Sequence, residues 1–167
     1  MQKQWLIDAH NVMHLLPDVL KGYAGNRLDG IEYLTSLIDG LCISQKRKAL
    51  LVFDGYPLHL GMKPHHCRVA FGGGKSADEA IINRLKNKNL ANQWIVVSND
   101  REVLDRARRQ GAETLTAHNF ILKIGSRTHA REQDTASSAG HPLKKADVEV
   151  SDHEVEEMLR LFNKDKP

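Results

Sequence analysis

The sequence has little cysteine and no long apolar run, and both absences narrow what the protein can be. Its two cysteines, Cys42 and Cys67, stand far apart and form no C-x-x-C pair, so neither a disulfide framework nor a thiolate zinc site is expected. We predict that both are small buried hydrophobic residues. No segment approaches the roughly 20 apolar residues of a membrane span, and no basic region followed by a long apolar run marks a secretory signal. A soluble cytoplasmic protein is expected.

Length and charge bear on the number of domains and on the kind of partner. The chain has 167 residues, 41% of them hydrophobic, and a formal net charge of +3, which suits one globular domain better than two. Residues 1–125 contain 17 Lys and Arg against 12 Asp and Glu, whereas the rest contains 7 against 9. A mildly basic body with an acidic tail is compatible with a phosphate-rich partner, although the excess is modest.

Apolar runs alternate with helical spacing along the first 120 residues. Buried strands are predicted at Trp5–Ile7, Ala49–Phe53, Cys67–Phe71, Trp94–Val97 and Thr114–Thr116. Between them, apolar residues recur at spacings of three and four over Leu28–Ile43, Ala77–Lys88 and Arg101–Gln110, which predicts helices. This alternation indicates an α/β fold with a mainly parallel sheet that is covered on both faces.

The composition changes after residue 125. From 126 to about 147 the chain is rich in small and polar residues and has hardly any large apolar ones, so we predict a flexible linker. Residues 148–167 follow with capping-box spacing at Ser151 and Glu154 and an apolar stripe at helical intervals, which predicts a C-terminal amphipathic helix and tail. Docking of that stripe on the body is favoured over binding of a partner.

Four aspartates occupy comparable positions relative to the predicted strands and helices. Asp8 and Asp54 close the first two strands, Asp100 follows the Trp94–Val97 strand, and Asp78 stands at the start of a helix. Ligands of open parallel sheets bind outside the carboxyl ends of the strands. We therefore expect these carboxylates to converge on one crevice.

A cluster of carboxylates without counter-charge would be destabilised by repulsion. A hard divalent ion, Mg²⁺ or Mn²⁺, is the expected partner because it prefers carboxylate and water oxygens. Such an ion would bind a phosphodiester and activate a water molecule, so hydrolysis of a nucleic-acid backbone is the natural reaction. Glu79 is a candidate outer ligand.

Each aspartate also has a structural explanation. Helix capping alone would account for Asp78 and Asp100 about as well, but it is less persuasive for Asp8 and Asp54. Asn11 is either a cap or a group that orients a phosphate or a water molecule, and the second role is slightly favoured. Turn formation explains Ser98 and Asn99 almost as well as contact with water or substrate does.

These residues stand in sequences that resemble one family. The segments are L-I-D-A-H-N-V at 6–12, V-F-D-G at 52–55, S-A-D-E-A-I at 76–81 and V-S-N-D-R-E at 97–102. Over about residues 4–120 the chain resembles the YacP-like NYN domains of the PIN-like ribonucleases. The resemblance implies a PIN-like (Rossmannoid) three-layer fold over residues 1–125, dependence on Mg²⁺ or Mn²⁺, and internal cleavage of RNA. It assigns Asp8, Asp54, Asp78 and Asp100 to the acidic metal-binding and catalytic positions, and Asn11 to the asparagine.

The chain departs from the family at one point. The familiar opening D-G-Y-N is here D-A-H-N, so Ala9 and His10 replace a glycine and a tyrosine. His10 brings a titratable ring in place of a phenol, and we count it among the RNA-contacting residues. Asn11 and Pro17 favour an irregular segment around His10 and His14, which argues against a zinc site there.

A glycine-rich segment and a basic rim complete the candidate RNA contacts. Gly72–Ser76 lacks the spacing of a Walker A motif; it is either a plain loop or a turn that lets Lys75 and backbone N–H groups approach phosphates. Tyr56 either stacks on a base or packs internally. The predicted rim comprises His59, Lys63, His65, His66, Arg68, Arg101, Arg106, Arg108 and Arg109, each of which is also explained as solvated surface charge.

The favoured hypothesis is an endoribonuclease that acts in RNA processing or decay. By analogy with the family, 5′-phosphate and 3′-hydroxyl ends are expected. The first alternative is a non-catalytic module that binds RNA, a ribosome or another ribonucleoprotein, and the altered residues Ala9 and His10 motivate it. A second alternative is a metal-dependent phosphatase of small substrates, which would not need the basic rim.

Overall fold

The computed structural model describes residues 2–123. Contacts divide the chain into two compact units, Met1–Ala117 and His118–Pro167. The predicted linker at 126–147 and the predicted helix at 148–167 lie outside the described residues, as does the predicted end of the nuclease domain at residue 125. Residues 117–123 are helical. The site described below belongs to the first unit.

The centre of the first unit is a five-stranded sheet. Its strands are β1 (Gln4–Asp8), β2 (Ala49–Phe53), β3 (Cys67–Phe71), β4 (Trp94–Val97) and β5 (Glu113–Leu115). They pair in the order β3-β2-β1-β4-β5, and every pair is parallel. The predicted α/β fold with a mainly parallel sheet is confirmed, and each predicted strand agrees with an observed one to within one or two residues at each end.

The helices are α1 (Ala9–Met13), α2 (Pro17–Gly25), α3 (Arg27–Ser44), α4 (Ala77–Leu85), α5 (Lys88–Ala91) and α6 (Arg101–Arg109). The prediction of an irregular segment around His10 and Pro17 is wrong, because two short helices form there. Pro17 occupies the first turn of α2, where its fixed φ and missing N–H are tolerated. The predicted Ala77–Lys88 helix ends early, at Leu85, and α5 follows as a separate turn.

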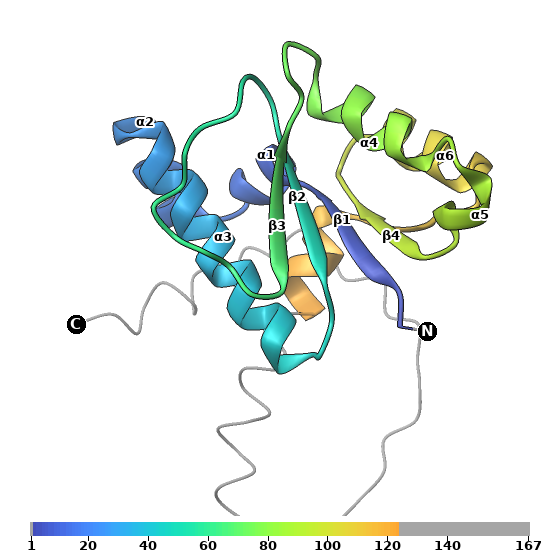
Figure 1. The fold of residues 1–167 in the computed structure, drawn as a ribbon, viewed down its shortest axis with the longest axis horizontal. Helices are drawn as coiled ribbons and strands as arrows, with labels where there is room; N and C mark the ends of the chain where they lie inside the picture. The colour runs from blue at the N-terminus through green and yellow to red at the C-terminus, as the bar shows by residue number, and fades with distance from the viewer. Residues whose placement is uncertain (1, 124–167) are drawn as a thin grey trace, which may run out of the picture. The chain divides into compact units, whose positions relative to one another are not determined.

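The helices cover both faces of the sheet and make the fold three-layered (Figure 1). α3 packs against β2 and β3, α4 against β1 and β2, and α6 against β4 and β5. Buried residues of the α4 and α6 side form one cluster, which includes Leu6, Leu50, Val52, Ile81, Val96 and Leu104. Since side chains alternate along a strand, the residues between them face the opposite layer.

The connection from β2 to β3, residues 54–66, contains no helix and is anchored instead by Asp39 of α3. The Asp39 carboxylate accepts hydrogen bonds from the backbone N–H groups of His65 at 3.1 Å, His66 at 2.7 Å and Cys67 at 2.8 Å. Burial acts to raise the pKa of Asp39, but these three bonds outweigh it and lower the pKa. The carboxylate is therefore a structural anchor for the start of β3.

Both cysteines are free and buried, as predicted. Burial raises the pKa of Cys42 to about 12, and it also raises the pKa of Cys67. The thiols are therefore protonated and unreactive near neutral pH. Separately, none of the helices within residues 2–123 has the length and apolar character that crossing a membrane requires.

Candidate active site at the carboxyl ends of the strands

The register of β1 with its two neighbours aligns the carboxyl ends of the central strands. Asp8 lies opposite Val52 of β2, and Ile7 lies opposite Val97 of β4. Ser98, the residue after Val97, is thereby level with Asp8, and its hydroxyl donates to Asp8 Oδ2 at 3.2 Å. Two polar residues 90 positions apart become neighbours because their strands are paired in parallel.

Side-chain alternation sets the face on which these groups lie. Leu6 of β1 and Val52 of β2 belong to the cluster packed beneath α4 and α6. Asp8 and Asp54 follow them by two residues, so both carboxylates fall on the same side, beside the first turns of these helices. The strands deliver the carboxylates, and the helices supply the backbone N–H groups that meet them.

Asp8 is buried, with 3% of its surface exposed. Its carboxylate accepts from the Asn11 backbone N–H at 3.3 Å, from the Asn11 side-chain amide and from Ser98. The first of these bonds makes Asp8 the N-cap of α1, so the prediction that capping is unpersuasive for Asp8 is wrong. Burial nevertheless prevails over the hydrogen bonds and raises the pKa of Asp8.

Asp100 is exposed and caps α6, which agrees with the capping alternative of the sequence analysis. Its carboxylate accepts from the N–H groups of Glu102 at 2.7 Å and Val103 at 3.2 Å. Its own N–H donates to the Ser98 hydroxyl at 3.0 Å. Ser98 therefore joins Asp8 to Asp100 through one buried hydroxyl group.

Asn11 and Asn99 tie the loops after β1 and β4 together. Asn11 Oδ1 accepts from the Asn99 backbone N–H at 3.2 Å, and Asn99 Oδ1 accepts from the N–H of Ala117 at 2.9 Å. Asn11 thus holds the Asp8 carboxylate with its amide while it fixes the position of the Asp100 loop with its carbonyl. Contact of these amides with substrate stays a prediction.

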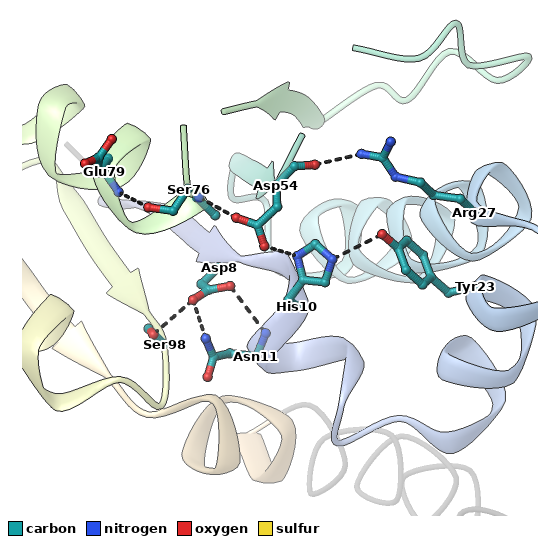
Figure 2. A network of polar contacts seen from close by, with 10 residues as sticks. Asp8, His10, Asn11, Tyr23, Arg27, Asp54, Ser76, Glu79 and Ser98 are labelled. Atoms are coloured by element: carbon teal, nitrogen blue, oxygen red, sulfur yellow. Dashed lines mark hydrogen bonds and ion pairs between the residues drawn. The ribbon is translucent and has the colours of Figure 1, made fainter. Parts of the chain in front are cut away.

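Asp54 is held by three different elements (Figure 2). Its Oδ1 accepts from the N–H of Ala77, the first residue of α4, at 2.6 Å. Its Oδ2 lies 3.0 Å from His10 Nδ1, and its backbone carbonyl accepts from Arg27 Nη2 at 2.7 Å. About half of the side chain, 52%, is exposed. The carboxylate is therefore oriented by the protein yet reachable from solvent.

Asp78 carries the clearest electrostatic signature of the cluster. The N-cap of α4 is Ser76, whose hydroxyl accepts from the Glu79 N–H at 3.2 Å, so the suggestion that Asp78 caps this helix is wrong. Burial raises the pKa of Asp78 to about 6, helped by the negative charges of Asp8, Asp100, Asp54 and Glu102, in that order. Asp78 thus lies within electrostatic reach of the other three aspartates.

The chemistry of this donor set fits a hard divalent cation, since aspartate oxygens are the ligands that Mg²⁺ and Mn²⁺ prefer. Among residues 2–123, no three His, Cys, Asp or Glu side chains already surround a common point. Mg²⁺ does not require such a cage, because it usually keeps several waters and binds through one or two carboxylates together with substrate phosphates. Burial of Asp78 together with the negative charges of Asp8, Asp100 and Asp54 nearby favours a cation there.

The predicted RNA contacts divide into two groups. Lys75 and Tyr56 lie beside the cluster: Gly73 and Gly74 form a left-handed turn with φ of 63° and 91° before Lys75, and a Cβ on Gly74 would come within 3.2 Å of the Tyr56 hydroxyl. Tyr56 is 69% exposed, so the packing alternative for it is wrong. Arg101, exposed, directly follows Asp100.

Other arginines of the predicted rim do not lie together at the site. Arg68 is exposed near the amino end of the edge strand β3, whereas the carboxylates gather at the carboxyl ends. On α6, Arg108 pairs with Asp105 at 2.6 Å and Arg106 lies 3.8 Å from Glu102. These arginines therefore form part of a mixed-charge helix face.

Sequence reasoning missed Tyr23 and Arg27, which approach Asp54 and His10 from α2 and α3. His10 Nε2 lies 3.2 Å from the Tyr23 hydroxyl. No spacing or motif marks either residue, because their relation to Asp54 arises only when α2 and α3 pack beside the loop after β2.

Comparison with known proteins gives the family and the fold. A family model described as the YacP-like NYN domain matches residues 5–163. The solved structure of Rae1 (YacP) from Bacillus subtilis is similar with a TM-score of 0.66 at 20% identity, covering 80% of each chain. A solved point mutant of the same Bacillus subtilis protein gives a TM-score of 0.64 at 21% identity, covering 79% of this chain and 80% of that one. A search of curated proteins finds no match. The chain therefore belongs to the YacP-like NYN domain family, and its fold is that of a PIN-like, ribonuclease-type domain.

Proposed function

We propose that this protein is an Mg²⁺- or Mn²⁺-dependent endoribonuclease that hydrolyses RNA phosphodiester bonds at the four-aspartate cluster. The observation that carries the proposal is the gathering of aspartates at the carboxyl ends of the strands: Asp8 and Asp100 share the Ser98 hydroxyl, and Asp54 accepts from the N–H of Ala77, the residue before Asp78. Burial and the charges of the other three aspartates raise the pKa of Asp78. Clustered carboxylates repel one another, and a bound divalent cation would offset that cost. Membership of the YacP-like NYN domain family supports RNA as the substrate.

Asp8, Asp54, Asp78 and Asp100 are the residues that would hold one or two such ions, with Glu79 as an outer group. When bound, the cation would stabilise charge that develops on the phosphate oxygens and would lower the pKa of a coordinated water. The protein would keep the ligands in place: Asn11 and Ser98 fix the Asp8 carboxylate, and the first N–H of α4 fixes Asp54. Preorganised ligands avoid reorganisation during the reaction.

RNA would approach on the exposed side of Asp54. Tyr56, mostly exposed beside the glycine turn, offers a ring on which one base can stack. Lys75 and Arg101, on either side of the cluster, would pair with phosphates. His10, Ser98 and Asn99 would act closer to the ligands. Arg68, at the other end of β3, would touch only RNA that runs along the sheet edge.

The test is cleavage of an end-labelled single-stranded RNA and of a circular RNA by the purified protein. Cleavage of both RNAs is expected with Mg²⁺ or Mn²⁺ and not with EDTA, with 5′-phosphate and 3′-hydroxyl products. Asp8→Asn and Asp100→Asn should each lower the rate by at least about a hundredfold, the loss typical when a charge-stabilising group is removed. Asparagine caps helices as well as aspartate does, so the fold should survive.

Asp105→Asn is the matched control, because Asp105 lies on the outer face of α6 and pairs with Arg108. Its rate should stay at the wild-type level. Unchanged metal-dependent cleavage by the Asp8 and Asp100 variants would rule the proposal out. A wild-type protein that binds RNA, or ribosomes, without cutting RNA would favour a non-catalytic module, and hydrolysis of phosphomonoesters alone would favour a phosphatase.

A further inference from the structure

His10 contacts protein groups through both of its ring nitrogens (Figure 2). Nδ1 lies 3.0 Å from Asp54 Oδ2, and Nε2 lies 3.2 Å from the Tyr23 hydroxyl. The Nδ1 atom is buried and its N–H direction is poorly aligned with Asp54, so the contact is closer to an electrostatic one than to an ideal hydrogen bond. The distance still makes Asp54 the partner of this nitrogen.

The chemistry of the two partners indicates which ring nitrogen of His10 carries the proton. An ionised carboxylate only accepts hydrogen bonds, and Nδ1 is the ring nitrogen beside Asp54, so the tautomer with the hydrogen on Nδ1 suits this site. In the neutral ring Nε2 is then the acceptor, and the Tyr23 hydroxyl donates to it. Tyr23, His10 and Asp54 therefore form a chain that ends on the Asp54 carboxylate.

The His10 ring is also fixed by its packing. Its plane stands nearly perpendicular to the rings of Tyr23 and Phe53, at 89° and 79°, with centroids 5.6 Å and 6.0 Å away. Edge-to-face contacts of this kind are favourable. Less than a quarter of the side chain, 23%, is exposed, so the ring is poorly placed to reach across to RNA.

The position of Tyr23 depends on a close approach of α2 to α3. A Cβ on Gly30 would lie 2.4 Å from the Tyr23 Cβ, so only glycine at position 30 leaves room for Tyr23. From the same side, Arg27 donates to the Asp54 carbonyl at 2.7 Å. The α2–α3 pair thus holds the Asp54 backbone directly, through Arg27, and the Asp54 side chain indirectly, through the contact of Tyr23 with His10.

We propose that His10, supported by Tyr23, is a positioning residue that holds the Asp54 carboxylate in the orientation in which it binds the divalent cation. This inference rests on the proposed function, and it gives His10 a role other than direct RNA contact. Groups that orient metal ligands typically change metal affinity by about 10–100-fold when they are removed. Without His10 the half-exposed carboxylate would keep the Ala77 N–H on Oδ1 but would lose the contact that holds Oδ2.

Two near-isosteric variants separate the two ring nitrogens. In His10→Asn the amide nitrogen is bonded to Cγ, as Nδ1 is, and can still donate to Asp54; in His10→Gln it lies one bond further out, toward Tyr23. Mn²⁺ binding to the full chain is measured by titration calorimetry. We expect His10→Asn to stay within about threefold of wild type, and His10→Gln and His10→Phe to bind Mn²⁺ at least about tenfold more weakly.

Two further measurements distinguish positioning from stability or RNA contact. The ¹³Cγ signal of Asp54 should shift in His10→Gln and in Tyr23→Phe, with melting temperatures near that of wild type, while KM for a single-stranded RNA stays within about twofold. Equal Mn²⁺ affinity of wild type and all His10 variants would overturn this inference alone, as would a raised KM with unchanged Mn²⁺ affinity. A wild-type protein without Mn²⁺ uptake would overturn the proposed function as well.

Discussion

The two sides of the aspartate cluster are built in different ways. On the braced side, Asp8 and Asp100 cap the helices that directly follow them and share the buried hydroxyl of Ser98. On the open side, neither Asp54 nor Asp78 is the N-cap residue of a helix, and Asp54 depends on His10 and on the N–H of Ala77 from other parts of the chain. Contacts within a few residues orient much of the first pair, with Ser98 added to Asp8 by strand pairing, whereas tertiary packing alone orients Asp54.

The two sides also differ in electrostatics. Asp8 is buried among donors, and its raised pKa comes from burial, which those donors oppose. Asp78 has no such set of donors among the causes of its shift: burial and four negative neighbours all raise its pKa. The braced side is therefore suited to rigidity. On the open side, binding of a cation and a substrate would change the electrostatic environment of the aspartates more.

The largest effect on stability is expected on the braced side. Asn11→Leu removes the amide that donates to Asp8 and the carbonyl that accepts from Asn99. Because each loss at a buried partner costs about 1–3 kcal/mol, the free energy of unfolding should fall by about 3 kcal/mol in urea denaturation. Asn83→Leu, at an exposed position of α4, should change it by no more than about 0.5 kcal/mol. Similar losses in both variants would show that the hydrogen bonds of Asn11 contribute little to the free energy of unfolding.

A smaller effect is expected for RNA binding on the open side. Tyr56→Ala should weaken binding of a single-stranded RNA by about tenfold, since stacking of a base on an aromatic ring contributes about 1–3 kcal/mol. Tyr56→Phe keeps the ring and should bind as wild type does. Neither change should alter the free energy of unfolding much, because Tyr56 is largely exposed. Equal affinities of wild type and Tyr56→Ala in fluorescence anisotropy would exclude the stacking role.

The smallest effect is a pH dependence. The pKa of Asp78 is about 6 in the folded protein and about 4 in an unfolded chain, so the folded state binds the proton more tightly. Stability from this group is complete below about pH 4 and is lost as the pH rises toward about 6 and beyond. Between pH 7 and pH 5 the melting temperature of wild type should therefore rise relative to that of Asp78→Asn by roughly 2 °C.

Saturating Mg²⁺ at pH 7 should reduce this difference, because the ion would replace the proton as counter-charge. Parallel melting curves of the two proteins at every pH, measured by circular dichroism, would show that Asp78 is not strained by its neighbours. The electrostatic difference between the braced side and the open side would then be excluded.

Much of the candidate site could be predicted because strand ends can be recognised in the sequence. Apolar runs such as Leu50–Phe53 end abruptly at an aspartate, and parallel pairing brings such ends together. Arg68, which the sequence analysis includes in the basic rim, instead lies near the amino end of β3, away from that edge. By contrast, α1 has only five residues and α2 contains two glycines among its nine, which weakens a helical signal, so neither was anticipated.

The sequence by itself determined the order of the strands and of helices α3, α4 and α6, the aspartates at the carboxyl ends of β1, β2 and β4, and the resemblance to the family, because these depend on patterns within a few neighbouring residues. Only the tertiary structure decided which groups hold those carboxylates. The contact of His10 with Asp54, the support from Tyr23 behind it and the anchoring of β3 by Asp39 join residues 13 to 44 positions apart. Such contacts follow from the packing of α2 and α3 against the sheet, and packing is a property of the whole fold that no local pattern encodes.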